Sequence, residues 1–415
     1  MITSEQTAAP KSFAIVLVCY KRLDGVRRLV TALEKADYAG RKDISLIFSI
    51  DNSGSSAVKE FAEGHSWPYG PKRVRTFPER QGLKNHILQC GDFTREYDIV
   101  AILEDDILVS DSFYRYAYGA AEAYWNDKRV AGISLYNFQK NWLRWILRFE
   151  PQHSAYDAYF MRIAQSWGQV WMLKKWQDFK AWYDEHLEFT KSDSIPAYLN
   201  SWPESSWLKY HDRYCIETDR WFVYPYVSLS TNCSSAGEHT SGCTADYQVE
   251  LQYGKEEYSF PPLNEEAIRY DEYMDRVGLG RFLGVPEEEL TVDLWETKHP
   301  SIWKKYLLTC RRMGCKALKE FGLSLRPIEL SVIENIPGHD LFLYDTTQPM
   351  HRACKDEATG KLLAYSLRTH DASALMKCAA YAGAMKYKHI AKRIVGKTAC
   401  RMRPRARRVF IESGP

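Results

Sequence analysis

The chain has 415 residues, enough for about two or three domains of ordinary size. Hydrophobic residues make up 45% of it and charged residues 26%, so the chain as a whole is neither disordered nor collagen-like nor a coiled coil. The longest apolar runs, 13–20 and 99–103, are much shorter than the roughly 20 residues that cross a membrane, so we expect no transmembrane segment.

The positive charge is concentrated at the C-terminus. The net charge is +3, but residues 372–415 contain 11 Lys and Arg and a single acid, so they carry +10 and residues 1–371 carry −7. A basic tail with interleaved apolar residues is typical of segments that lie on an anionic membrane surface. A plain solvated helix fits the pattern equally well. Nucleic acid is the weaker alternative, because the tail has few aromatic residues and no nucleic-acid-binding motif.

The first 135 residues alternate between two patterns. Short runs rich in β-branched residues predict strands over 13–19, 44–50, 74–77, 98–103 and 130–135. Helical spacing of apolar residues predicts helices over 24–33, with Asp24 at its N-cap, 83–94 and 112–125. This alternation predicts an α/β fold with a mostly parallel, Rossmann-type sheet and helices on both faces.

The later part of the chain is less regular. Nine of the thirteen tryptophans fall within 142–221, and a strand is predicted over 225–229. Residues 263–300 have an acidic, helix-like pattern, and residues 301–322 have the spacing of a basic amphipathic helix. We therefore expect a first domain over 1–260, with halves at about 13–135 and 136–260. A mixed or mainly helical extension over 261–371 and the basic tail over 372–415 follow it.

Three consecutive carboxylates, Glu104-Asp105-Asp106, come directly after a predicted buried strand. Their mutual repulsion is costly unless a cation or hydrogen-bond donors stabilise them. Mn²⁺ and Mg²⁺ prefer oxygen ligands of this kind and usually share them with substrate phosphates. A solvated acidic turn is the alternative. Ligands of open parallel sheets bind beyond the carboxyl ends of the strands, and Asp51 also lies at such an end.

Several short motifs follow one another between residues 13 and 245. The first half contains VCYKR at 18–22, QGLKN at 81–85 and VAILEDDILVSDSFYRY at 100–116. The second half contains GISLYN at 132–137, SWGQVW at 166–171, PYVSL at 225–229 and GEH at 237–239. In this order and spacing they resemble a GT-A fold glycosyltransferase, of the N-acetylglucosaminyltransferase I type and its bacterial relatives. The resemblance does not extend over the remaining ~170 residues.

The resemblance implies a donor site built around the acidic triplet. Asp106 would ligate a Mn²⁺ or Mg²⁺ ion that bridges the diphosphate of a nucleotide sugar, and His239 would lie near the diphosphate or the metal. The other nucleotide-binding residues that it implies are Cys19, Arg22, Asp51, Lys84, Asn85, Glu104 and Asp105.

An inverting transferase needs a carboxylate that takes the proton of the acceptor hydroxyl. The resemblance implies such a base near Trp202–Trp207, and we choose Glu204, although the family often has Asp where this chain has Ser206. Asp212, Glu217 and Asp219 stay open, and Glu204 fits helix capping equally well. We expect most of the tryptophans to pack in the core. The acceptor-binding candidates are Asn137, Trp167, Trp171 and Trp207.

The expected function is metal-dependent, inverting transfer of a sugar from a nucleotide sugar, and no residue excludes a retaining outcome. The resemblance implies a UDP-sugar as the donor. A glycan or lipid-linked glycan would be the acceptor in the assembly of a surface polysaccharide. The alternatives are a sugar-phosphate nucleotidyltransferase, which the lack of a Gly-rich loop after the first strand disfavours, and a non-catalytic glycan-binding or scaffold protein. With scattered cysteines and no C-x-x-C pair, a reduced cytoplasmic protein is expected, peripheral at the inner membrane face if the tail binds lipid.

Overall fold

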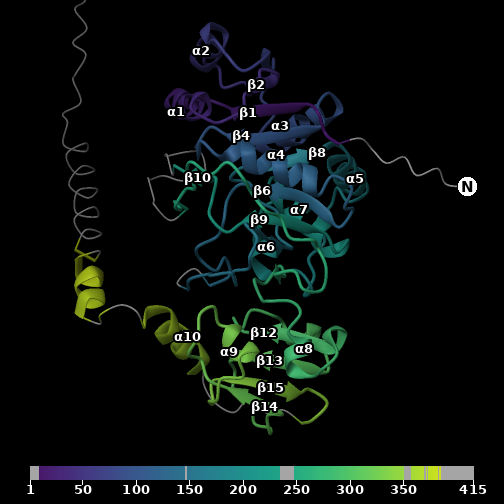
Figure 1. The fold of residues 1–415 in the computed structure, drawn as a ribbon, viewed down its shortest axis with the longest axis vertical. Helices are drawn as coiled ribbons and strands as arrows, with labels where there is room; N and C mark the ends of the chain where they lie inside the picture. The colour runs from purple at the N-terminus through teal and green to yellow at the C-terminus, as the bar shows by residue number, and fades with distance from the viewer. Residues whose placement is uncertain are drawn as a thin grey trace, which may run out of the picture. The chain divides into compact units, whose positions relative to one another are not determined.

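The computed structural model describes residues 9–144, 147–233, 247–349, 357–368, 371, 373–381 and 383–384. By their internal contacts, residues 1–362 and residues 363–415 form two separate units. The first unit contains a nine-stranded sheet and a four-stranded sheet (Figure 1). In the second unit, the end of α10 (Glu357–Leu367) and residues 373–381 are helical.

The nine-stranded sheet confirms the predicted mostly parallel α/β fold. Its spatial order is β11-β7-β9-β6-β8-β4-β1-β2-β3. The strands are β1 (Phe13–Cys19), β2 (Ile44–Ile50), β3 (Lys72–Thr76), β4 (Ile99–Glu104), β6 (Val130–Ser134), β7 (Ala158–Met161), β8 (Gln169–Met172), β9 (Trp221–Pro225) and β11 (Arg269–Tyr270). The block β3-β2-β1-β4 is entirely parallel, whereas β8 runs antiparallel to both β4 and β6.

Helices cover both faces of this sheet, as the alternating pattern predicts. Phe13, Ile15 and Leu17 of β1 pack in one core cluster with α1 and α4. Ala14 and Val16, whose side chains point the other way, pack with α3, α5 and α7. The helices of this part are α1 (Leu23–Glu34), α2 (Ala57–Gly64), α3 (Leu83–Gly91) followed by η1 (Asp92–Arg95), α4 (Phe113–Ala123), α5 (Leu173–Glu185), α6 (Ala197–Ser201) and α7 (Leu208–Glu217).

Two sequence predictions in this part are corrected. α1 begins at Leu23, so Asp24 lies within its first turn instead of capping it, and no side chain caps this helix. Residues 225–229 are not one strand, because β9 ends at Pro225 and β10 (Ser230–Asn232) begins after the gap. β10 pairs with β5 (Ile107–Val109) in a small antiparallel sheet directly after the acidic triplet.

The four-stranded sheet replaces the amphipathic helix that we predicted over 301–322. Its order is β12-β13-β15-β14, with β12 (Leu290–Asp293), β13 (Tyr306–Thr309), β14 (Lys319–Phe321) and β15 (Leu341–Asp345). The short helices around it are α8 (Gly280–Leu283), η2 (Glu287–Glu289), η3 (Pro300–Ile302) and α9 (Leu330–Ile333). Residues 306–309 are held between β12 and β15, and this tertiary pairing overrides their local helical spacing.

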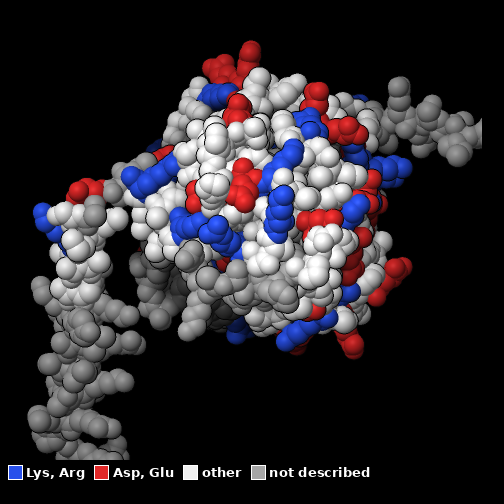
Figure 2. Space-filling view, turned by 90° about the horizontal axis from the view of Figure 1, so that it is seen from below, with Lys and Arg blue, Asp and Glu red and all other residues white. Residues whose placement is uncertain are grey.

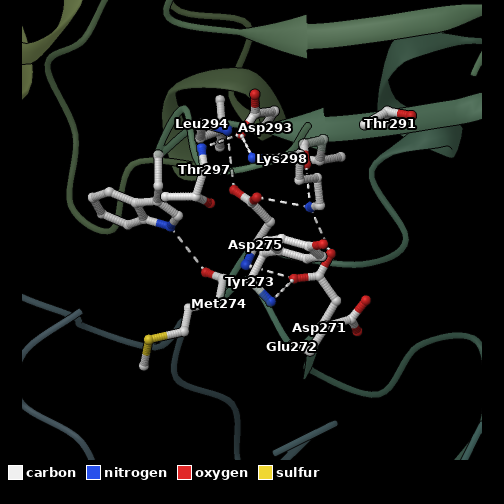
Figure 3. Close-up of polar contacts among 12 residues, drawn as sticks. Asp271, Glu272, Tyr273, Met274, Asp275, Thr291, Asp293, Leu294, Thr297 and Lys298 are labelled. Atoms are coloured by element: carbon white, nitrogen blue, oxygen red, sulfur yellow. Dashed lines mark hydrogen bonds and ion pairs between the residues drawn. The ribbon is translucent and has the colours of Figure 1, made fainter. Parts of the chain in front are cut away.

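A buried lysine joins the two sheets (Figure 3). Lys298 Nζ donates to Asp271 Oδ2 at 2.7 Å and to Asp275 Oδ2 at 2.8 Å, both in the turn that follows β11. Asp293, at the end of β12, accepts the backbone N–H of Lys298 at 3.1 Å. Burial opposes the charged amine, but the three carboxylates outweigh it and raise the pKa of Lys298. The charge of Lys298 therefore compensates acids from both sheets.

A second buried contact joins β11 to the carboxyl group of Glu329, at the N-terminus of α9. The Tyr270 hydroxyl of β11 donates to Glu329 Oε1, and burial raises the pKa of Glu329 to about 7. The folded protein therefore keeps Glu329 protonated at pH values at which the unfolded chain has lost this proton.

We expect this carboxyl to make stability fall as the pH rises. Between the ordinary glutamate pKa of 4.5 and the folded value, the native state binds more protons, so Glu329 lowers the free energy of unfolding by up to about 3 kcal/mol across that window. Glu329→Gln removes the titration. Urea unfolding of both proteins from pH 4.5 to 8 should show the difference between them growing up to about pH 7 and constant above it. A pH-independent difference would contradict this assignment.

Candidate functional site

The carboxyl ends of β1, β2 and β4 meet at one edge of the sheet. In the parallel register Val18 lies opposite Glu104, and Cys19 lies opposite Ile50. The segment after β1, Asp51 after β2 and the acidic triplet after β4 therefore lie beside one another. We call Glu104, Asp105 and Asp106 the acidic turn.

Arg22 holds the acidic turn from the loop after β1. Its Nε donates to Asp105 Oδ1 at 2.8 Å, its Nη2 also contacts that oxygen, and Nη1 lies 3.4 Å from Asp106 Oδ2. Burial raises the pKa of Asp105, and the charge of Arg22 offsets part of this rise. The resemblance placed Arg22 among the nucleotide-binding residues, which stays a prediction, and the structure shows that Arg22 is the partner of two acids.

One guanidinium does not compensate three carboxylates. Burial raises the pKa of Glu104 well above its ordinary value, and the neighbouring Asp106 and Asp105 raise it further. Asp106 Oδ1 is buried and has no hydrogen-bond partner among the described residues. This unpaired oxygen and the excess negative charge fit a divalent cation.

The protein supplies few metal ligands at this place. Within the described ranges, no group of three or more His, Cys, Asp or Glu side chains is arranged to hold a metal ion. Mg²⁺ typically binds one or two carboxylates and takes its other ligands from water and substrate phosphates. Asp106 with Glu104 fits this mode, in which the nucleotide completes the site. His239 lies outside the described residues.

Three backbone contacts fix the acidic turn. A Cβ on Gly25 of α1 would lie 2.3 Å from the carbonyl oxygen of Asp105, so only glycine allows this approach. The N–H of Cys233 donates to the carbonyl of Asp106 at 2.7 Å. β5 then pairs with β10 from Ile107 onward. No sequence pattern indicates the role of Gly25, because this role depends on a contact between segments that are 80 residues apart.

Asp51 organises the loop before α3. Its carboxylate accepts the N–H groups of Asn52 at 2.8 Å, Gln81 at 2.7 Å and Gly82 at 3.0 Å, and it is 4% exposed. In the described residues its role is to hold the N-terminal end of α3 against β2. Its predicted contact with a nucleobase or ribose stays a prediction.

Lys84 and Glu204, predicted for different parts of the site, lie together. Lys84 Nζ donates to the carbonyl of Glu204 at 3.2 Å and lies 4.3 Å from the ring centre of Tyr210. Asn85, one residue on, donates to the carbonyl of Gln81 at 3.3 Å. α3 is thus joined to the segment between α6 and α7.

The Glu204 carboxylate is exposed and accepts two side-chain hydrogen bonds. Tyr210 Oη donates to it at 2.7 Å and Lys209 Nζ at 3.3 Å. The Tyr210 bond, followed by Lys209, lowers the pKa of Glu204. The carboxylate is therefore ionised at neutral pH, as a base must be, but its proton affinity is reduced.

The three alternative bases have different environments. Asp212 is buried, accepts the N–H of Ala164 at 2.6 Å, and has a pKa that burial raises well above its ordinary value. Glu217 accepts from Arg213 at 2.6 Å, and Asp219 accepts from Arg162 at 2.9 Å. None of the three is brought to the acidic turn by a contact among the described residues.

Three of the predicted acceptor residues are buried in this structure. Trp171 is 1% exposed and stacks on Trp176 with ring centres 4.2 Å apart, and Trp207 is 4% exposed. Both indoles belong to the core, as we expected of most tryptophans, and their contacts with an acceptor stay predictions. The Asn137 side chain is occupied by Tyr226 and Tyr159 at 2.8 and 2.7 Å.

Cys19 and Trp167, two further predicted site residues, differ in exposure. The Cys19 thiol is buried and donates to the carbonyl of Leu17, so it does not line an open site. Trp167 stays partly exposed because it precedes β8 instead of lying within it. Trp167 contacts Trp142 and Tyr247, and Trp142 in turn contacts Tyr198 and Trp202. The sequence prediction missed these residues as a group, and the high density of tryptophans was the only signal for them.

Comparison with known proteins adds little to this geometry. No family model matches the chain, and no curated protein matches it. Similar solved structures include a mannosyltransferase of Pyrobaculum calidifontis in complex with GDP-Man and Mn²⁺, with 13% identity and a TM-score of 0.32. They also include TarS of S. aureus with UDP-GlcNAc, at 10% identity and 0.33, and GalNAc-T7 with UDP, GalNAc and Mn²⁺, at 13% and 0.38.

These likenesses are weak and partial. The matches cover 53%, 56% and 54% of this chain and 58%, 62% and 43% of the three neighbours, in the same order. At such TM-scores they carry no argument about function, which we therefore argue from the acidic turn and its surroundings.

Proposed function

We propose that the protein is a metal-dependent glycosyltransferase that moves a sugar from a nucleotide sugar to a glycan or lipid-linked glycan. The observation that carries the proposal is the acidic turn at the carboxyl edge of the sheet, in which Asp106 Oδ1 is buried and has no partner within the described part of the chain. The motifs around it resemble a GT-A glycosyltransferase, and that resemblance favours a UDP-sugar as donor.

The chain's own residues divide the work of donor binding. Asp106, with Glu104 beside it, would hold Mn²⁺ or Mg²⁺, which supplies charge neutralisation for a departing diphosphate. Arg22 fixes Asp105 and, through it, the geometry of the turn. Asp51 fixes the loop that leads into α3, the helix that carries the proposed nucleotide contacts Lys84 and Asn85.

The direct test is turnover of UDP- and GDP-sugars with Mn²⁺ or with EDTA, measured as release of nucleoside diphosphate. We expect Mn²⁺-dependent release from one donor. Exchange of a nucleoside triphosphate with a sugar phosphate would instead identify a nucleotidyltransferase. If no donor gives turnover or a nucleotide-induced rise in melting temperature, the proposal is contradicted and a binding or scaffold role remains.

For an inverting reaction we retain Glu204 as the proposed base, because it is exposed and its segment is joined to Lys84. Glu204→Gln should lower kcat by about 100-fold or more with an unchanged KM for the donor, since base catalysis contributes about 10²–10⁴-fold. Glu185→Gln, which changes an exposed acid at the end of α5 that is not among the candidate bases, is the matched control. Equal rates in both variants would transfer the role to another carboxylate.

We also propose that the enzyme works in the cytoplasm at the inner face of a membrane. The argument is the +10 charge of residues 372–415, whose basic residues beyond Lys377 lie outside the described ranges. On the face of the protein that Figure 2 shows, Lys and Arg are interspersed with Asp and Glu, so this face has no continuous positively charged patch. Among the helices in the described part of the chain, none has the length and apolar character that a membrane crossing requires.

A further inference from the structure

Five aromatic residues from separate segments meet at the surface. We call Trp142, Trp167, Tyr198, Trp202 and Tyr247 the aromatic cluster, and each of them is partly exposed. Trp142 is central, with ring centres 5.6 Å from Trp167, 6.3 Å from Tyr198, 6.4 Å from Trp202 and 6.3 Å from Tyr247. Trp167 and Tyr247 are 4.6 Å apart, and Tyr198 and Trp202 are 5.3 Å apart. Folding alone brings these rings together.

The aromatic cluster begins beside the acidic turn. Gln169 of β8 pairs with Ile102 of β4, two residues before Glu104, so the loop that carries Trp167 leaves the sheet at the same edge. The carbonyl of Trp167 accepts from the hydroxyl of Ser230 in β10, whose partner strand β5 follows Asp106 directly. At the other end of the aromatic cluster, Trp202 lies two residues before Glu204.

The turn after β11 and the segment after β12 contact the part of the chain that carries Trp142. The N–H of Trp142 donates to Met274 Sδ at 3.0 Å, and the carbonyl of Met274 accepts from Trp295 Nε1 at 2.9 Å. Met274 lies in the turn that Lys298 holds through Asp271 and Asp275 (Figure 3). Arg144 Nε also donates to the carbonyl of Trp295 at 2.9 Å. These contacts fix Trp142 before any ligand arrives, which lowers the entropic cost of binding.

Trp and Tyr rings combine an apolar face with a polar edge. Sugar rings have the complementary pattern, with apolar C–H faces and hydroxyl edges. Singly scattered apolar residues are the ordinary arrangement on a protein surface. A contiguous group of partly exposed aromatic rings is instead typical of a binding site. A phosphate or a metal ion would instead require basic or carboxylate side chains at the centre of the group.

We propose that the aromatic cluster binds the acceptor glycan and presents it to the donor held at the acidic turn. The inference rests on the proposed function for the word acceptor, whereas binding of carbohydrate by the aromatic cluster does not depend on it. Trp142 and Trp202 carry the largest share, Trp142 because it touches every other ring and Trp202 because it is next to the Glu204 segment.

The test uses an array of immobilised glycans as the probe, with UDP–Mn²⁺ calorimetry on the same proteins. We expect the wild type to bind a subset of the glycans, and Trp142→Ala and Trp202→Ala to bind them about tenfold or more weakly, as the loss of a ring contact of about 1.4 kcal/mol implies. UDP–Mn²⁺ affinity should stay unchanged in both. Trp202→Phe, which keeps a ring, should retain most of the affinity.

The matched control is Trp182→Ala, which removes a partly exposed indole of α5 that stacks on His186 at 4.3 Å, outside the aromatic cluster. It should bind glycans as the wild type does. No glycan binding by the wild type, or equal binding by the wild type and both cluster variants, would overturn the inference. Glycan binding that depends on the aromatic cluster, together with no nucleotide binding, would uphold it and overturn the transferase proposal.

Discussion

Replacing Lys298 with methionine should lower the free energy of unfolding by about 3–5 kcal/mol at pH 8. The reason is that Asp271, Asp275 and Asp293 would stay buried without the cation that compensates them, and removing one partner of a buried ion pair typically costs this much. Methionine keeps most of the side-chain volume, so the effect reports charge and not a cavity.

The loss should be smaller at pH 5. Burial already raises the pKa of Asp275 well above its ordinary value, and without Lys298 the acids would take up protons more readily as the pH falls. Urea unfolding at both pH values measures this. Lys304→Met, at an exposed lysine of the same part, should change stability by about 0.5 kcal/mol or less. A Lys298→Met variant that is as stable as the wild type at pH 8 would refute the assignment. Adding Asp275→Asn to Lys298→Met should restore part of the lost stability.

Replacing Gly25 with alanine should reduce activity about 100-fold. The new methyl group would lie 2.3 Å from the carbonyl oxygen of Asp105, and backbone on both sides prevents an easy adjustment, so the acidic turn must shift. A displacement of about 1 Å at a reacting centre can cost this factor. Overpacking of this kind should also lower stability by about 1–3 kcal/mol.

A glycine of the neighbouring helix provides the control. Gly64, at the end of α2, has open space around its Cβ position, so Gly64→Ala should leave both stability and activity close to wild type. Rates of nucleotide release and melting temperatures of the two variants give the comparison. If Gly25→Ala released nucleotide as fast as the wild type does, the acidic turn would tolerate displacement and its position would not be critical.

The sequence predicted best what depends on local composition. β1, β2 and β4 are buried on both faces, so their β-branched apolar runs are unmistakable, and the position of the acidic turn follows from the end of β4. The sheet order beyond β4 was not predictable, because β8 enters antiparallel between β4 and β6 from a distant part of the chain.

What depends on tertiary contacts was missed. Residues 301–322 have helical spacing, yet pairing with β12 and β15 makes part of them a strand. Trp171 and Trp167 are four residues apart, and only the structure shows that one is in the core and the other is at the surface. Sequence spacing carries no information on which side of a strand meets a helix or on the close approach of Gly25 to Asp105.

If the proposed function is right, Asp106 completes a divalent metal site together with a nucleoside diphosphate. The most direct measurement is the electron paramagnetic resonance signal of free Mn²⁺ during titration with protein and UDP or GDP. We expect the wild type to remove Mn²⁺ from solution only when one nucleotide is present. Asp106→Asn should bind it about tenfold or more weakly, whereas Asp24→Asn, at an acid of α1 with a 99% exposed side chain, should bind as the wild type does. Equal Mn²⁺ binding by Asp106→Asn and the wild type, or no nucleotide-dependent binding at all, would contradict the account.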